Sequence, residues 1–528
     1  MIEKLTPQKI WGEYTKGKDY NTALDLYETV KRNENFYIGN QWEGVIAPDL
    51  EKPVINVLKR TVNYFVSQIV SDDIGVSFTA QTGAPDDEII TDTLEKEVEK
   101  VIEDAELSAK GRRHLRNCAV DGDCAIYGYY DSDYDNGQLI KGRICADIVD
   151  NTNIIFGNPS SSDVQSQPHI IIVKRSQIGT VKKQAAGLGL SQNDIEQIKA
   201  DKETEYYRED KDETSDLVTE LIRFEKISII ANEQTGEKKT VMLVSQSVKN
   251  LVLYQKTLEY ELYPVAYMSW DEIKNSYHGQ SAVTGMIVNQ IYINKMWAMM
   301  MHHQKTMAFP KVFYDQQKLP DGITNKVGQA VPTIGPPTGV IATSFKPSDM
   351  SSQAMMIVEK TIGYTRDMMG ASDAALGNIK PDNTSAIIAV QKATAAPLEL
   401  QRLAYYQYTE AIVRVIVDMI RVHYGARPVQ IEQNGQKQQA VIDFGQVNYK
   451  QLQLRVDIGP AAYWSELMQV QTIDNLYSKQ IITDPVKYLE SIPDAYIRNK
   501  GKLIKDLRER QNMLQQIQGG MANAMPIV

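Results

Sequence analysis

The feature that most constrains this chain is a pair of long helical segments separated by a short stretch rich in proline and glycine. From Gln280 to Thr306 no glycine or proline follows Gly285, and the pattern predicts one helix of about 40 Å. The stretch from Phe309 to Pro347 holds six prolines and four glycines, which excludes a helix and indicates a small compact insert. A second helix is predicted from Met350 to Met369, and Gly370 is expected to end it in a left-handed turn. The two helices are therefore expected to pack as an antiparallel pair that carries the insert at one end.

Helical and strand patterns alternate before this pair. Asn56 is a plausible N-cap for a helix that ends at Val70, and Asp86 to Glu106 predicts an amphipathic helix with an acidic face. The charge-dense stretch from Glu205 to Glu220 predicts a surface loop or a short helix. The β-rich runs between Lys226 and Lys256 predict a hairpin followed by another strand.

Further elements are predicted after the pair, and no internal repeat is found. They are a third helix from Thr384 toward Tyr424 with a kink at Pro397, a hairpin of Val429–Glu432 and Ala440–Phe444 around Asn434-Gly435, a half-buried strand from Leu452 to Ile458, and a polar helical segment from Ser465 to Gln518. The insert is expected to contain short strands at Lys311–Tyr314 and Gly339–Thr343. Helices and hairpins in this order predict an α+β fold.

Charge, cysteine content and hydropathy narrow the classes of function. The 528 residues carry 57 Lys plus Arg against 67 Asp plus Glu, a formal charge of −10, whereas a clamp that neutralises DNA phosphates is basic. The three cysteines, Cys118, Cys124 and Cys145, are too few for a disulfide scaffold and favour a reducing compartment. No signal peptide is expected from the first residues, and the Asn, Gln and His between Asn275 and Asn294 argue against a membrane span.

Four short patterns resemble sites of chemistry, and each fails a requirement. Gly12 to Lys18 nearly fits a phosphate-binding P-loop, but Asp19 replaces the Ser or Thr that binds Mg²⁺. The acidic run from Asp131 to Gly137 resembles a calcium loop, but Gly137 comes one place late and position twelve is Gly142, so an acidic turn between two strands is favoured over a cation site. His302 and His303 are adjacent on a helix and point apart, and the cysteines lack C-x-x-C spacing. We therefore expect no catalytic residue, no metal and no cofactor.

Three local patterns accompany the helix pair. They are Tyr37-Ile-Gly-Asn-Gln-Trp42 followed by Pro53-Val-Ile-Asn56, Gly370-Ala-Ser-Asp-Ala-Ala-Leu-Gly377 followed by Asn383-Thr-Ser385-Ala386, and Ala396-Pro397-Leu398. Together with the order of elements, they make the chain resemble the portal proteins of tailed bacteriophages. The correspondence covers nearly the whole chain, although portal sequences have no invariant signature.

This resemblance implies an organisation of the chain. It consists of an N-terminal wing (1–279), a first stem helix (280–308), a clip (309–347), a second stem helix (348–371), a tunnel loop (372–384), a kinked helix with returning wing strands (385–460), and a helical crown with a tail (461–528). The family has no catalytic residues. It forms a ring, commonly a dodecamer, at one vertex of the virion capsid, where the subunits contact the packaging ATPase, the head–tail adaptor, the major capsid and scaffolding proteins, and the double-stranded DNA that passes through.

The resemblance also assigns three groups of residues. Gly377, Asn378, Lys380 and Asn383 would line the DNA tunnel, with Lys380 forming a collar of weak phosphate contacts; otherwise this is an interhelix loop with Lys380 in bulk water. Met299 and Met355 would lie in the stem interface of the ring, because eleven of the nineteen methionines fall between Met286 and Met369; the alternative is ordinary helix packing. Lys502, Lys505 and Arg508 would form a basic crown face toward packaged DNA, or simply a solvated helix face.

Two other classes of function remain open. An enzyme that acts on DNA would need a metal-binding carboxylate cluster or a complete P-loop, and neither is found. A different virion ring or a nonviral scaffold would not need paired helices around an insert.

Overall fold

The computed structural model describes most of the chain. The described residues are 4–70, 74–80, 85–137, 140–201, 216–232, 237–309, 311–323, 330–334, 341–345, 352–371, 396–433, 436–447, 452–458, 470, 472–482, 484–492, 497, 500, 502–505, 507 and 510. The α-helices are α1 (Pro7–Ala23), α2 (Leu26–Ile38), α3 (Val57–Ile69), α4 (Pro85–Asp104), α5 (Leu107–Asp121), α6 (Ile178–Gly187), α7 (Gln192–Glu196), α8 (Ile287–Ala308), α9 (Ser352–Met368), α11 (Glu399–His423) and α13 (Pro485–Ser491).

Every strand pairing in the described chain is antiparallel, which makes the protein an α+β fold as predicted. The strands are β1 (Ile74–Ala80), β2 (Asp123–Asp131), β3 (Arg143–Asp150), β4 (Ile154–Phe156), β5 (Ile170–Gln177), β6 (Leu217–Asn232), β7 (Glu237–Val248), β8 (Leu251–Leu258), β9 (Val265–Ser269), β10 (Lys311–Tyr314), β11 (Ala342–Phe345), β12 (Ala426–Gln433), β13 (Gln436–Asp443) and β14 (Leu452–Ile458).

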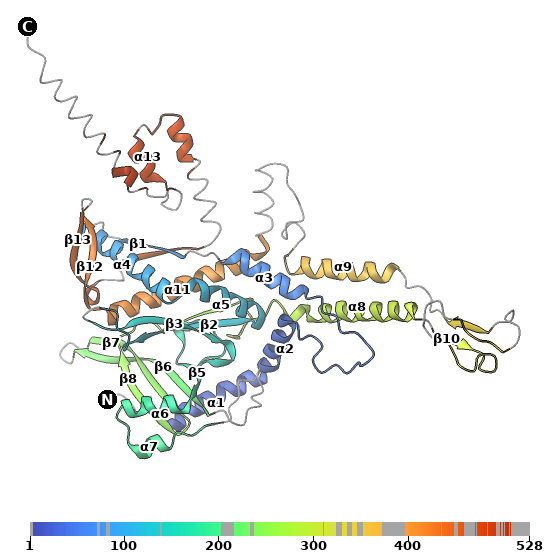
Figure 1. The fold of residues 1–528 in the computed structure, drawn as a ribbon. Coiled ribbons are helices and arrows are strands. Elements are labelled where there is room, and N and C mark those ends of the chain that lie inside the picture. The colour runs from blue at the N-terminus through green and yellow to red at the C-terminus, as the bar shows by residue number, and fades with distance from the viewer. Residues whose placement is uncertain are drawn as a thin grey trace, which may run out of the picture.

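The body is built on two sheets. One has three strands in the order β3-β2-β9, and the other has five in the order β4-β5-β6-β7-β8. Helix α11 packs against β2, β3 and β9, and α5 packs against β2 and β3 (Figure 1). Helix α1 covers one face of the five-stranded sheet, where Ile10 and Tyr14 contact Ile155, Ile171 and Leu243. The three-stranded sheet meets the opposite face of that sheet within the main core.

Local sequence explains several elements that were predicted. The Asn56 side chain caps α3 by accepting a hydrogen bond from the Lys59 backbone N–H, and the apolar face of this helix is buried. The acidic helix α4 buries Leu94 and Val98 and exposes its charged face. The hairpins β6–β7 and β12–β13 and the strand β14 also form as predicted.

The near P-loop is not a loop, because Gly12 to Asp19 lies inside α1. Gly17 faces the sheet there, and a Cβ atom at this position would overlap the Ile155 side chain. The glycine is therefore explained by close packing of a helix on a sheet.

Two predicted boundaries are wrong. The helix expected from Gln280 begins only at Ile287, because Gln280 bonds to Asp271 and Ala282 bonds to Ala119 of α5, which holds this segment out of helical geometry. The loop or helix expected up to Glu220 gives way to β6 from Leu217, since pairing with β5 adds strand bonds there. At Pro397, where a kink was predicted, the chain forms a short 3₁₀ turn, Ala396–Leu398, directly before α11, and a missing N–H costs little there. The segment 384–395 lies outside the described residues.

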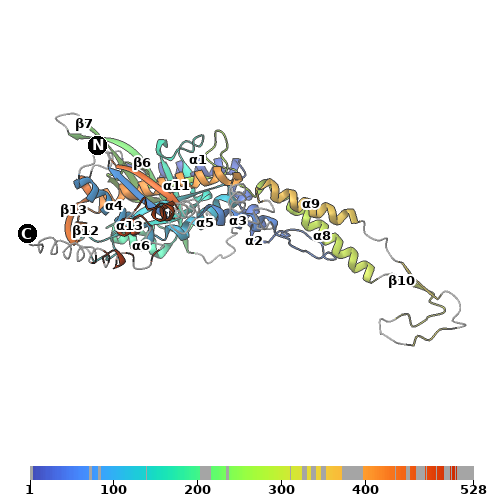
Figure 2. The same cartoon turned by 90° about the horizontal axis from the view of Figure 1, so that it is seen from above.

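Two helices leave the body side by side. In both views α8 and α9 extend away from the sheets and carry β10 and β11 at their far end (Figures 1 and 2). Strands β10 and β11 form a two-stranded antiparallel sheet that pairs Lys311 with Phe345, three residues from the end of α8. The predicted antiparallel helix pair with an insert at one end is therefore present, and we call it the stalk, with β10 and β11 at its tip. None of the helices that the structure describes is long and apolar enough to cross a membrane.

A buried histidine in the body is expected to make stability depend on pH. The His114 ring stacks on Tyr408 at a centroid distance of 3.9 Å, and burial lowers its pKa to about 3. Because the unfolded chain takes up a proton near pH 6.5 and the folded chain does not, stability falls as the pH drops from about 6.5 toward about 3. Between about pH 7.5 and about pH 5 the expected loss from this group is about 2 kcal/mol. Urea unfolding of His114→Phe should show a flatter pH dependence than the wild type; equal slopes would contradict this assignment.

Candidate functional site: the two-helix stalk

The base of the stalk is anchored by two buried amides on α8. Gln290 accepts a hydrogen bond from the Val57 N–H at 3.0 Å and donates to the Ile55 carbonyl at 2.6 Å. One turn further along, Asn294 accepts from the Ile55 N–H at 3.2 Å and donates to the Gln41 side chain at 2.5 Å. Both side chains are buried, so their bonds join the stalk firmly to the segment before α3.

These bonds explain one of the local sequence patterns. Asn56 donates to the carbonyls of Phe36 and Tyr37, and the Trp42 indole donates to the Pro53 carbonyl at 2.8 Å. The two halves of the pattern, 37–42 and 53–56, therefore fold against each other and then against α8. In the sequence, this anchor could have been inferred from Gln290 and Asn294, two amides four residues apart on an otherwise apolar helix. Our sequence analysis used them only as an argument against a membrane span.

The two stalk helices contact each other mainly near the body. Ile293 of α8 and Val358 of α9 are buried together with Val57, and Asn289 donates to the Thr365 hydroxyl across the pair at 3.1 Å. Beyond Ala298 no residue of α8 is fully buried. The outer half of α8 thus has no fully buried residue, although Lys305 near its end lies 3.5 Å from Glu51 of the segment before α3.

Helix α8 presents an apolar stripe to solvent. Val288, Tyr292 and Met299 are spaced at i, i+4 and i+11, so they lie within about 40° of one another on the helix. Their exposed fractions are 66%, 40% and 59%. Lys295 is the one charged side chain between them on this face of α8. The stripe is therefore apolar surface that the rest of the subunit does not cover.

Helix α9 presents a second stripe. Ile357, Tyr364 and Met368 are spaced at i, i+7 and i+11, again within about 40°, and Tyr364 and Met368 are 63% and 78% exposed. An isolated helix pair would be expected to turn these side chains inward. Each helix of the stalk therefore has its own exposed apolar stripe.

The two methionines singled out from the sequence occupy different positions relative to these stripes. Met299 belongs to the stripe on α8. Met355 is also exposed, at 47%, but lies about 160° around α9 from the stripe of Ile357, Tyr364 and Met368. Within one subunit neither methionine is packed in a core. Our sequence analysis missed Tyr364 and Val288, because crowding of methionines does not show which face of a helix is covered.

Apolar side chains are also exposed at the tip. All four residues of β10 are exposed, and Phe309 and Phe313 are among the most exposed aromatic side chains of the described residues. Leu319 is the buried residue of this region, and the Ile334 N–H donates to the Lys318 carbonyl at 3.0 Å. The described residues of the tip thus present an aromatic outer surface.

The chain leaves the stalk and returns at one place. Gly370 ends α9 in the left-handed conformation predicted for it (φ 78°), and a Cβ atom at this position would overlap the Pro397 side chain. Ala371 and Leu398, on either side of the gap in the described chain, are buried in the main core. The proposed tunnel residues Gly377, Asn378, Lys380 and Asn383 lie outside the described residues.

The remaining candidate residues are dispersed. Lys502 and Lys505 are exposed, as expected for either reading of the crown face, and Arg508 lies outside the described residues. The acidic run Asp131–Gly137 follows β2 and leads toward β3 as a turn, as predicted. Among the residues that the structure describes, no group of three or more His, Cys, Asp or Glu side chains is placed to hold a metal ion.

Comparison with known proteins adds no relative. No protein-family model matches this sequence, and no curated protein matches it significantly. The geometry of the stalk and the order of the elements along the chain are therefore the basis for assigning a function.

Proposed function

We propose that this protein is the subunit of a ring that conducts DNA, a portal protein of a tailed bacteriophage. The observation that carries the proposal is the projecting stalk with two separate exposed apolar stripes. Such surface is costly in water, and a second copy of the same chain is the partner that supplies a matching surface.

The two stripes favour a ring over a closed dimer. In a two-fold dimer each subunit uses the same patch, so one stripe would suffice. If the α8 stripe of one copy instead packs on the α9 stripe of the next copy, the interface is head-to-tail, and repetition around an axis closes a ring. The side chains are well suited to this role, since methionine and tyrosine adapt to imperfectly matched surfaces.

The other parts of the chain receive roles by resemblance. The body is the wing, the stalk is the stem, and the aromatic tip is the clip that meets the packaging ATPase and later the head–tail adaptor. Lys380 would form a weak collar around the DNA, and the basic residues near Lys502 would face the packaged genome. A net charge of −10 suits a channel in which DNA must slide, because few cations hold the phosphates.

The alternative functions have less support. For an enzyme acting on DNA, the described residues offer neither a metal-binding carboxylate cluster nor a P-loop, since the nearest match is helical. A different virion ring or scaffold would explain the stripes equally well, but it would give no role to an aromatic tip.

Native mass spectrometry and negative-stain imaging of the purified chain test the proposal. We expect a ring, commonly of twelve copies, with a central hole wide enough for a DNA duplex. A monomer or a compact dimer at micromolar concentration would contradict it.

A further inference from the structure

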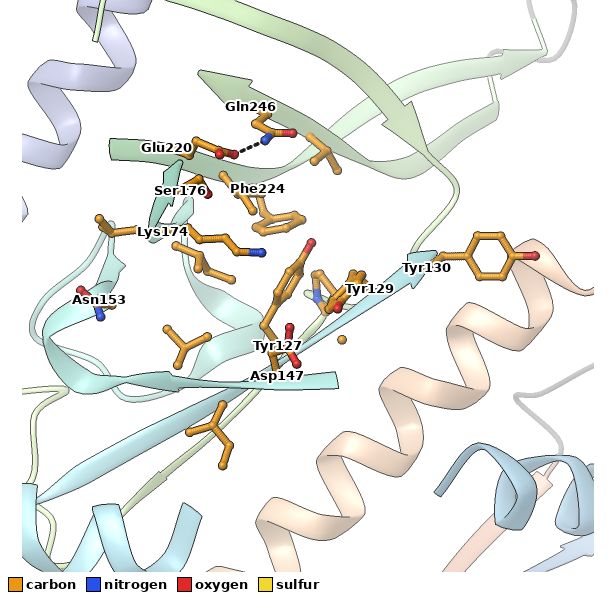
Figure 3. A pocket seen from close by; sticks show the side chains of 18 of the residues that line it. Tyr127, Tyr129, Tyr130, Asp147, Asn153, Lys174, Ser176, Glu220, Phe224 and Gln246 are labelled. Atoms are coloured by element: carbon orange, nitrogen blue, oxygen red, sulfur yellow. Dashed lines mark hydrogen bonds between the residues drawn. The ribbon is translucent and has the colours of Figure 1, made fainter. Parts of the chain in front are cut away.

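A cavity in the body is bordered by the two sheets. Its volume is about 850 Å³, within the range of ligand-binding pockets, and its lining includes four consecutive residues of β3 (147–150) and four of β5 (173–176). Figure 3 shows side chains from both sheets converging on this space. Consecutive residues can line a cavity only if the strand presents its backbone edge as well as one face.

Both strands have an unpaired edge at the cavity. Strand β3 is the outer strand of its sheet, paired only with β2. Strand β5 pairs with β4 only through Ile170–Ile172, although β5 continues to Gln177. The reason is the 3₁₀ turn Asn151–Asn153, which separates β4 from β3 and directs β3 into the other sheet. No other segment of the described chain takes the place of β4 by forming backbone hydrogen bonds with this edge of residues 173–176.

The free edge of β5 offers hydrogen bonds in a fixed pattern. In an antiparallel strand, alternate residues direct both N–H and C=O toward the same neighbour. The pairing with β6 uses one set of alternate residues, so two of the four residues from Val173 to Ser176 direct donor and acceptor toward the cavity. An added strand would satisfy these groups.

The charges at this edge are not neutralised by one another. Lys174 and Glu220 are directly opposite on β5 and β6, where an ion pair is the usual arrangement. Instead, the Glu220 carboxylate accepts a hydrogen bond from the Gln246 side chain, and the Lys174 ammonium extends into the cavity without an ion pair to any described residue (Figure 3). Arg113 also lines the cavity.

The acidic side chains at the cavity are already engaged. Asp147 lies 3.7 Å from the Lys110 ammonium, and Asp150 accepts a hydrogen bond from Asn117 at 3.2 Å. Burial raises the pKa of the Asp150 carboxyl, and the hydrogen bond from Asn117 and the nearby Arg113 charge oppose this shift. The lining carries five cationic side chains (Lys110, Arg113, Lys174, Arg175 and Lys256) and three carboxylates (Asp147, Asp150 and Glu220), so its net charge is positive.

The floor of the cavity is apolar and aromatic. Tyr127 of β2 contacts Phe224 of β6 at a ring-centroid distance of 5.6 Å, and Ile172, Ile222 and Tyr254 continue this surface across the sheet. Side chains of an added strand alternate in direction, so every second one would reach this floor.

We propose that the cavity binds an extended acidic segment of a protein partner, which adds as a strand to the edge of β5 with a carboxylate on Lys174 and apolar side chains on the aromatic floor. This inference does not depend on the ring or on the function of the stalk. It assigns to the body a docking site separate from the tip.

Fluorescence anisotropy with the labelled peptide Ser-Glu-Glu-Val-Glu-Ile-Glu-Ser and the full-length protein tests this proposal. In an extended strand its first Glu, its Val and its Ile lie on one face, just as Lys174 and Ile172 share one face of β5. We expect saturable binding, slower amide hydrogen exchange at residues 173–176, and about tenfold weaker affinity for Lys174→Glu, since repulsion replaces attraction in a partly enclosed space. Lys183→Glu on α6, an exposed charge change outside the cavity, is the matched control and should bind like the wild type. Thermal melting verifies folding, and Lys174→Met replaces Lys174→Glu if the latter does not fold.

Peptide variants separate strand addition from simple charge attraction. N-methylation at alternate residues removes backbone donors, so at least one of the two possible frames should lose binding. The peptide with Lys in place of Glu should not bind. The proposal would be overturned if the acidic peptide did not bind or if both methylated peptides still bound. It would also be overturned if Lys174→Glu bound the peptide as tightly as the wild type, or if a single-stranded DNA oligonucleotide bound as tightly as the peptide.

Discussion

Replacing Met299 and Tyr364 together by glutamate is expected to abolish ring assembly while leaving the subunit folded. Both side chains are more than half exposed in the single chain, so their replacement should change its free energy of unfolding by less than about 1 kcal/mol. In the proposed ring each lies in a stripe covered by the next copy, and burying an unpaired carboxylate costs several kcal/mol at every interface. Native mass spectrometry should therefore detect monomers of normal melting temperature.

Gln304→Glu is the control for this prediction. Gln304 is exposed on α8, about 160° around the helix from Val288 and well away from the stripe, and its replacement adds one carboxylate where the double variant adds two. Rings should form normally with this variant. If rings also form normally with Met299→Glu and Tyr364→Glu combined, the stripes are not the interface and the stem assignment is wrong.

Replacing Phe309 and Phe313 by serine is expected to give intact rings that cannot package DNA. The two aromatic side chains are exposed at the tip, far from the anchor at Gln290, so assembly through the stalk should not depend on them. Exposed aromatic side chains provide most of the binding energy in many interfaces, and losing two would weaken docking of the motor by several kcal/mol. The measurement is the DNA content of particles assembled with this variant, together with direct binding of the ATPase to purified rings.

Gln316→Ala, a polar change at the same tip, should package DNA normally. Full heads with the double phenylalanine variant would show that the tip does not contact the motor. Failure to form rings would instead indicate that the tip contributes to the subunit interface, which separates this prediction from the one on the stalk.

Elements with strong local signals were predicted well. The N-cap at Asn56, the left-handed end of α9 at Gly370 and the hairpin of β12 and β13 all depend on residues within a few positions of one another. Such bonds form in any tertiary context, so they can be inferred from the chain alone. The short strand β1 was missed, since its partner β14 follows more than 370 residues later.

Elements whose limits depend on distant contacts were predicted less well. Residues 280–286 have a helical pattern, but bonds from this segment to Asp271 and Ala119 hold it outside α8. Likewise, β6 extends through a charged stretch because β5 and β7 lie on either side of it. In each case a set of tertiary hydrogen bonds outweighed a local preference of a few tenths of a kcal/mol per residue.

The sequence by itself determined that two long helices enclose a compact insert, because glycine, proline and hydrophobic spacing act over a few residues. Only the tertiary structure decided which faces of those helices remain uncovered, since burial depends on what the rest of the chain places beside them. The same holds for the body. Lys174 and Glu220 are ordinary charged residues until the pairing of β5 with β6 sets them opposite each other and the turn before β4 leaves one edge of β5 without a partner.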